Sequence, residues 1–121
     1  MKYYNTLLLN SFYRDKIVRF NAVVCLLLNI IVWAGLLWQS RTFSESIPLH
    51  YNIYFGIDLY GPWYQILLIP EVGLAVILIN FSVGGFLYAK EKLLSYFSVG
   101  LASFIQLILL LAAFAIVYVN L

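Results

Sequence analysis

Charged residues are scarce in this chain: Lys, Arg, Asp and Glu make up 10% of its 121 residues, whereas an ordinary soluble domain has about 25%. The single cysteine, Cys25, excludes an intramolecular disulfide. The residue spacings of a zinc site, a phosphate-binding loop and a nucleophile elbow are also missing from the sequence. We therefore predict a protein that is not an enzyme, with no metal, no other cofactor and no nucleic-acid partner.

The chain instead contains long apolar runs. Three runs, at residues 17–38, 66–89 and 97–120, are almost continuously apolar, and hydrophobic residues make up 64% of the chain. A helix rises about 1.5 Å per residue, so a run of about 22 residues reaches about 33 Å, enough to cross a hydrocarbon core of about 30 Å. We predict an all-α integral membrane protein, a single unit over residues 1–121 with three transmembrane helices in the lipid bilayer.

The basic residues are distributed unevenly between the two ends of these helices. Six of the seven lie in residues 1–19 or in the connection at residues 90–96, and only Arg41 lies in the connection at residues 39–65. Short loops rich in Lys and Arg stay on the cytoplasmic side. We therefore predict a multi-pass protein of the plasma membrane, with a cytoplasmic N-terminus, an outer loop at 39–65, a cytoplasmic loop at 90–96 and an external C-terminus.

The segment before the first membrane helix, residues 1–16, has a pattern of its own. Polar and basic residues recur every four positions, and so do aromatic and aliphatic ones, at Lys2, Thr6, Asn10 and Arg14 and at Tyr4, Leu8 and Phe12. In a helix this spacing separates a polar from an apolar face. We expect a helix in the cytoplasmic headgroup layer, with its basic residues near anionic lipid. Its role is to orient insertion or, alternatively, to dock a partner.

Polar residues inside the apolar runs are candidates for contacts between helices. The amides are Asn29 in the first run, Asn80 in the second and Gln106 in the third. Such side chains form hydrogen bonds between membrane helices that contribute about 1 kcal/mol or less each. We interpret them as contacts within the three-helix unit, with contacts in a homo-oligomer as the alternative. Gln106, near mid-membrane, is the residue for which we most expect an interhelical partner.

Glu71 is the only acidic residue within the three apolar runs, and it follows Pro70 near the start of the second. Proline fits the first turn of a helix, where its missing N–H costs no hydrogen bond. A carboxylate there meets the positive end of the helix dipole. We therefore expect a first-turn acid at the outer boundary of the membrane. The alternative is the titrating site of an oligomeric proton- or cation-coupled transporter or channel, because intramembrane acids are often functional.

The outer loop carries the most specific pattern in the chain. Turn-forming residues alternate with aromatic and aliphatic ones over residues 47–64, which favours a short strand or a small hairpin at the membrane surface. The aromatic residues suit the outer headgroup layer. If the turn lies near residues 54–56, His50 and Asp58 would approach each other across the hairpin, where the carboxylate would orient the imidazole. The alternative is that His50 has only a structural role in the turn. The spacing of His50 and Asp58 matches no recognised set of metal ligands.

The same loop resembles a signature of bacterial membrane proteins, approximately P-x-H-aromatic-N-x-x-G-x-x-D-x-x-G. It occurs in a membrane domain of unknown function in the N-terminal half of SdpI-type toxin-immunity proteins. The residues that match are Pro48, His50, Tyr51, Asn52, Asp58 and Gly61, with Gly56 one position later than in the family pattern. The resemblance implies a multi-pass plasma membrane protein that binds a toxin, a peptide or another membrane subunit, with these residues as its outer-loop motif.

Overall fold

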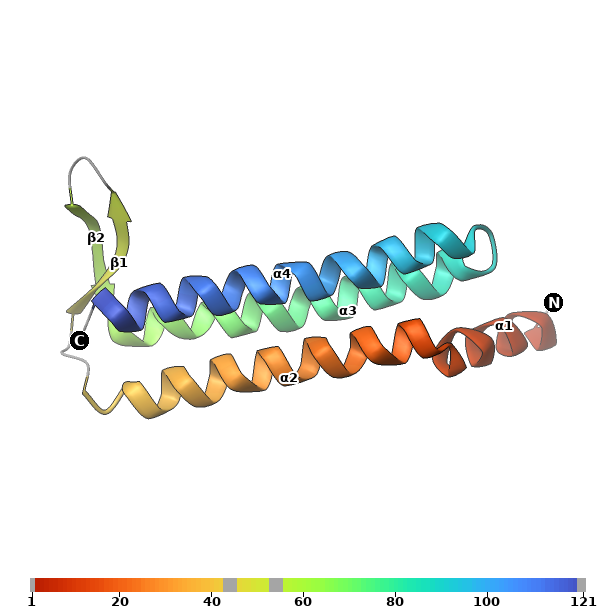
Figure 1. The fold of residues 1–121 in the computed structure, drawn as a ribbon, viewed down its shortest axis with the longest axis horizontal. Coiled ribbons are helices and arrows are strands. Elements are labelled where there is room, and N and C mark those ends of the chain that lie inside the picture. Colours follow the sequence, from red (N-terminus) through yellow and green to blue (C-terminus); the bar gives the residue numbers. More distant parts are fainter. Residues whose placement is uncertain (1, 43–45, 53–55, 120–121) are drawn as a thin grey trace.

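Three long helices lie side by side in the computed structural model of this chain (Figure 1). They are α2 (Lys16–Gln39), α3 (Leu68–Tyr88) and α4 (Lys92–Val119), and a short 3-10 helix, η1 (Trp63–Leu67), leads directly into α3. Each is long and apolar enough to cross a membrane, with α3 counted together with η1. The prediction of three helices suited to a multi-pass membrane protein is confirmed. The structure describes residues 2–42, 46–52 and 56–119.

The connection between α3 and α4 is shorter than expected. α4 begins at Lys92, well before the apolar run from which it was predicted, and only a turn at residues 89–91 separates it from α3. The predicted loop at 90–96 is therefore wrong in extent. An apolar run ends at its first polar residues, whereas a helix continues through them when their polar groups have hydrogen-bond partners. Ser95 has such a partner, because its hydroxyl donates to the carbonyl of Gly84 on α3 at 2.7 Å.

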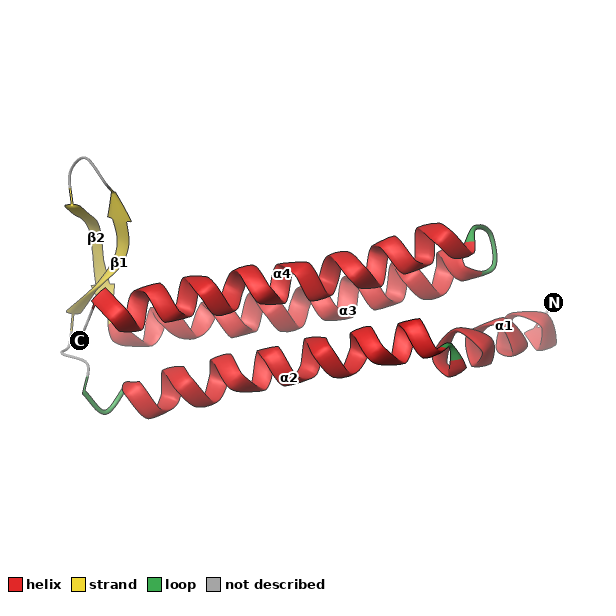
Figure 2. Cartoon of the chain, in the orientation of Figure 1, coloured by secondary structure: helices red, strands yellow, loops and turns green. Residues whose placement is uncertain are grey.

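Two antiparallel strands stand between α2 and η1: β1 (Ser46–Asn52) and β2 (Gly56–Pro62). Their register is irregular on both sides of His50, which lies opposite Leu59. Figure 2 shows the hairpin at one end of the bundle, where it runs across the direction of the helices and extends past α4. The structure describes the backbone of these strands, and the side chains at residues 46–61 lie outside the described part.

At the opposite end of the bundle lies α1 (Lys2–Arg14), in the segment predicted to form an interfacial helix. Phe12 anchors α1 to the bundle, because its ring is fully buried beside two glycines of α3. A Cβ atom on Gly84 or Gly85 would meet that ring at 3.4 or 3.6 Å, an ordinary van der Waals distance, so the ring packs closely against the backbone of α3. Of the two stripes expected on this segment, Asn10 and Arg14 of the polar stripe are exposed and Phe12 of the apolar stripe is buried. The other stripe side chains, at residues 2, 4, 6 and 8, lie outside the described part, and the place of α1 in the headgroup layer stays a prediction.

Apolar side chains fill the interior of the bundle in two clusters, one toward each end. The cluster toward the hairpin contains Val32, Leu36, Ile66 and Ala113, and the cluster toward α1 contains Phe12, Val18 and Val99. Along α2 and α4, the buried amides Asn29 and Gln106 fall between the two clusters. Many large apolar side chains on the outer faces of the helices are exposed, as expected where lipid tails are as apolar as the side chains themselves.

Candidate functional site

Buried amide groups join all three long helices near the middle of the bundle. Asn29 on α2 and Gln106 on α4 are only 3% and 1% exposed. The Asn29 Nδ2 donates to the carbonyl of Pro70 on α3 at 3.0 Å and to the Gln106 Oε1 at 3.3 Å. The Gln106 Nε2 in turn donates to the carbonyl of Gly73 at 2.8 Å. We call these four residues the amide cluster.

The amide cluster depends on the backbone of α3. Pro70 and Gly73 offer their carbonyls from the first turns of that helix, and a helical carbonyl keeps a second lone pair for an additional donor. A Cβ atom on Gly73 would lie 2.7 Å from the Asn29 Nδ2 and 2.8 Å from the Gln106 Oε1. Any larger residue would push both amides away. Glycine at this position therefore allows the two amides to lie as close to the α3 backbone as they do.

The chemistry of the amide cluster is that of a structural contact. Asn and Gln side chains carry no charge, and the four residues exchange hydrogen bonds among themselves. Within the described part of the chain, every buried side-chain nitrogen or oxygen has a hydrogen-bond partner. Also within that part, no group of three His, Cys, Asp or Glu side chains could hold a metal ion. The cluster fixes how the helices meet and holds no titratable group that could move a proton.

Further polar contacts lie along α4, on the α1 side of the amide cluster. The Ser103 hydroxyl donates to the Asn21 Oδ1 on α2 at 2.7 Å, and the Cys25 Sγ lies 3.4 Å from the same hydroxyl. The Ser98 hydroxyl donates to the carbonyl of Asn80 on α3 at 2.7 Å. Of the three amides singled out from the sequence, the structure thus brings Asn29 and Gln106 together, whereas Asn80 contacts α4 elsewhere, through its backbone.

Glu71 lies apart from the amide cluster. It is the acidic residue of the first turn of α3 and its side chain is exposed. Pro70 and Gly73, on either side of it, are buried against the other helices. Successive residues of a helix point about 100° apart, so Glu71 faces the surroundings of the bundle. Its depth in the membrane stays a prediction.

The outer-loop motif is gathered on the hairpin. Pro48, His50, Tyr51 and Asn52 lie on β1, and Gly56, Asp58 and Gly61 lie on β2. The register sets Asn52 opposite Gly56, and it sets His50 opposite Leu59, the neighbour of Asp58 in sequence. The backbones of the two halves of the motif are therefore adjacent, although the contact between the His50 and Asp58 side chains lies outside the described part.

In comparisons with known proteins, no family model, no curated protein and no solved structure matches this chain. The resemblance to SdpI-type proteins therefore stays a prediction from the loop residues alone.

Sequence reasoning missed one polar site, at the junction of α1 and α2. The Asp15 side chain is only 10% exposed. Its Oδ2 accepts hydrogen bonds from the hydroxyls of Tyr88 at 2.9 Å and Tyr96 at 2.5 Å, and the Lys92 Nζ lies 4.0 Å away. Its Oδ1 accepts from the backbone N–H of Ile17 at 2.9 Å and so caps α2.

Two signals in the sequence could have revealed the Asp15 site. An Asp directly before an apolar run is a typical helix N-cap, and Lys92 and Tyr96 stand four residues apart, on one face of a helix. Burial alone would raise the pKa of the Asp15 carboxyl, but the hydrogen bonds from Tyr96, Tyr88 and the backbone outweigh it and hold the pKa below its ordinary value. Asp15 therefore stays ionised and ties the α1–α2 junction to α3 and α4.

Proposed function

We propose that this chain is a non-enzymatic protein of the bacterial plasma membrane that binds a protein or peptide partner through its hairpin. One observation carries the proposal: the whole outer-loop motif lies on two paired strands at one end of a three-helix bundle (Figure 1). Binding residues are often found on connecting segments that a rigid scaffold positions. The bundle supplies such a scaffold, because the amide cluster joins its three helices.

The positions of the charges support an outward-facing hairpin. The hairpin and the end of α4 lie at one end of the bundle, and α1 and the α3–α4 turn lie at the other (Figure 1). Basic residues gather at the second end, among them Lys16, Arg19, Lys90 and Lys92. Because positive charge is retained in the cytoplasm, this arrangement favours a cytoplasmic N-terminus and an external hairpin. A partner would then reach the motif from outside the cell or from within the membrane.

The strands also indicate what kind of partner would bind. A two-stranded sheet leaves backbone N–H and C=O groups along its outer edges, and an extended peptide can add to such an edge by main-chain hydrogen bonds. An extended segment of a toxin, of a signalling peptide or of another membrane subunit would suit this geometry. The resemblance to SdpI-type immunity proteins supports the same class of partner.

The alternative hypothesis is an oligomeric proton- or cation-coupled transporter or channel that uses Glu71. Because the Glu71 side chain is exposed and turned away from the amide cluster, this function would require a second copy of the chain to face it. Partner binding by the hairpin needs no such assembly, and for that reason we favour it.

Site-directed photocrosslinking in native membranes tests the proposal. A photoreactive residue at Tyr60 on β2 should give a heterologous adduct, whereas one at Tyr13, exposed at the opposite end of the bundle, should not give the same adduct. The Tyr60 adduct should be lost in His50→Ala, Asn52→Ala and Asp58→Ala, with membrane insertion unchanged. An adduct that survives all three substitutions would remove the motif from the mechanism.

A further inference from the structure

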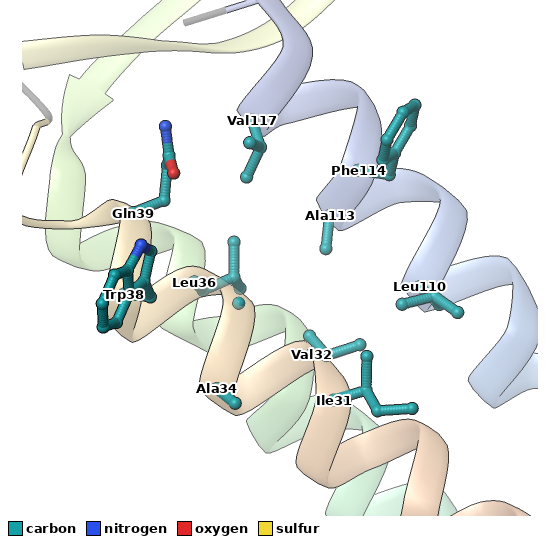
Figure 3. Close-up of a pocket in the computed structure, with 11 residues that line it drawn as sticks. Ile31, Val32, Ala34, Leu36, Trp38, Gln39, Leu110, Ala113, Phe114 and Val117 are labelled. Atoms are coloured by element: carbon teal, nitrogen blue, oxygen red, sulfur yellow. The ribbon is translucent and has the colours of Figure 1, made fainter. Parts of the chain in front are cut away.

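An apolar groove of about 620 Å³ runs between α2 and α4 near the hairpin end of the bundle (Figure 3). Its floor is the apolar cluster of that end, to which Val32, Leu36 and Ala113 belong. Figure 3 shows these side chains pointing into the space between the two helices. The groove therefore lies on the side of the bundle, open to whatever surrounds the membrane helices.

Missing side-chain volume creates this groove. Ala34 and Gly35 line it on α2, where larger residues would fill it. A Cβ atom on Gly35 would meet nothing within 4 Å, so the space beside this glycine is open. The side chains that line an unfilled groove lack partner atoms and lose dispersion contacts. An apolar molecule that fits the shape of the groove would supply those contacts.

The length of the groove decides between two kinds of apolar occupant. Its lining on α2 runs from Ile31 to Gln39, which is about 12 Å along a helix. One leaflet of the bilayer core is about 15 Å thick, half of the whole. A transmembrane helix of a partner or a second copy would pack along the full depth of the membrane. A single acyl chain of the leaflet at the hairpin end would instead match the groove.

The end of the groove nearest the hairpin carries a positive charge. Trp38 lines the groove there, and the Arg41 guanidinium lies over its ring, 5.0 Å from the centroid. Arg41 is exposed and follows the end of α2, at the level where lipid headgroups begin if α2 spans the membrane. A guanidinium binds phosphate oxygens by charge-assisted hydrogen bonds.

We propose that this groove and Arg41 form a binding site for one anionic phospholipid. An acyl chain lies in the groove beside Gly35, and the phosphate binds Arg41. A zwitterionic phospholipid fits the groove equally well, but its ammonium group opposes the charge of Arg41. The site therefore selects the headgroup by charge, and it needs no partner on the hairpin.

Native mass spectrometry of the purified protein, reconstituted with equal amounts of dioleoyl phosphatidylglycerol and dioleoyl phosphatidylcholine, tests the site. We expect one retained phosphatidylglycerol per chain. Arg41→Gln should reduce its retention about fivefold, the effect of one basic residue at a membrane surface. Gly35→Leu should abolish retention by filling the groove, and Ala34→Leu is the second variant if Gly35→Leu does not fold by circular dichroism.

The chain offers a matched control for each substitution. The Lys90 Nζ lies over the Phe86 ring at 4.3 Å at the other end of the bundle, so Lys90→Gln removes an equivalent charge. A Cβ atom on Gly100 of α4 would also meet nothing within 4 Å, so Gly100→Leu adds equivalent bulk elsewhere. Both controls should retain the lipid as the native chain does.

Three results would each overturn the proposal. The first is equal retention of the two phospholipids. The second is a lipid retention that does not depend on the site: it is unchanged in Arg41→Gln or in a folded groove-filling variant, or it falls equally in the controls. The third is that the native chain forms a dimer without bound lipid, and that this dimer dissociates in Gly35→Leu. A second copy of the chain would then be the occupant of the groove.

Discussion

The side-chain amide of Gln106 on α4 donates a 2.8 Å hydrogen bond to the backbone carbonyl of Gly73 on α3. A carbonyl has a fixed height along its helix, and a slip of one residue would move it by about 1.5 Å. Since the Gln106 Oε1 also accepts from Asn29 on α2, the same side chain relates the heights of all three helices. The bond therefore fixes the positions of the three helices relative to one another along the bundle axis.

Replacing Gln106 by leucine should destabilise the bundle. The substitution removes two buried hydrogen bonds, one from the Asn29 amide and one to the second lone pair of the Gly73 carbonyl, and Asn29 keeps its bond to the Pro70 carbonyl. We therefore expect a loss of about 1–2 kcal/mol in the free energy of unfolding. Unfolding in detergent micelles, followed by circular dichroism, measures the loss. Gln65→Leu is the matched control, because Gln65 is exposed on η1; an equal loss in both variants would contradict the role of the amide cluster.

Gly73→Ala should be as damaging as the loss of an amide. The added Cβ atom would overlap the Asn29 Nδ2 and the Gln106 Oε1, and relieving the overlap breaks their hydrogen bonds at a cost of about 1–3 kcal/mol. Gly100→Ala adds the same atom where nothing lies within 4 Å, and alanine is the better helix former by up to about 1 kcal/mol. The unfolding temperature should therefore fall in Gly73→Ala, and it should stay the same or rise in Gly100→Ala. Equal shifts would mean that Gly73 is not a close contact.

Acid should weaken the attachment at the α1–α2 junction. The pKa of the Asp15 carboxyl is lowered from its ordinary value of 3.8, because the hydrogen bonds from Tyr96 and Tyr88 outweigh burial. A carboxyl with a lowered pKa in the folded state stabilises the fold above its ordinary pKa, and this contribution is lost as the pH falls through the folded pKa. The unfolding temperature should therefore drop as the pH falls from about 5 through the lowered pKa of the folded state.

Two variants isolate Asp15 as the source of that drop. Asp15→Asn can still cap α2, because Asn is as good an N-cap as Asp, but it carries no charge to lose. This variant should be less stable than the native chain at neutral pH and should approach it in acid. Glu91→Gln removes an exposed acid in the α3–α4 turn and should keep the native pH profile. A native pH profile in Asp15→Asn would assign the acid sensitivity to another group.

Glu71→Gln separates partner binding from transport. Because the Glu71 side chain is exposed in the first turn of α3, the substitution should change the free energy of unfolding by less than about 0.5 kcal/mol and should leave the Tyr60 adduct intact. Proteoliposomes of the native chain and the variant should show equal, background flux of protons and cations. A flux in the native chain that Glu71→Gln abolishes would favour the transport hypothesis instead.

The sequence predicted the three long helices well because a membrane-spanning helix needs a minimum number of apolar residues, and this number can be counted in a single sequence. It could single out Asn29 and Gln106 as polar residues in apolar surroundings, but not that they meet on the carbonyls of Pro70 and Gly73. That meeting depends on the rotation and relative height of the helices, which apolar runs do not encode.

Asp15 shows a different limit. Its cap position could be read locally, but its partners Tyr88 and Tyr96 come from α3 and α4, which are brought to it only by the packing of the bundle. The early start of α4 at Lys92 has the same origin, since Ser95 is buried against α3 and not left in a loop. Both features are tertiary contacts made by polar residues, and an apolar pattern contains no trace of them.

The short turn at residues 89–91 also bears on how the protein is made. Of the helix pairs described, α3 and α4 share the most extensive contact, and the bond from Gln106 to Gly73 lies wholly within this pair. Two helices joined so closely can enter the bilayer together as one helical hairpin. Gln106 then has a partner for its amide N–H within this hairpin itself, and contact with Asn29 of α2, a helix that is synthesised earlier, completes the cluster.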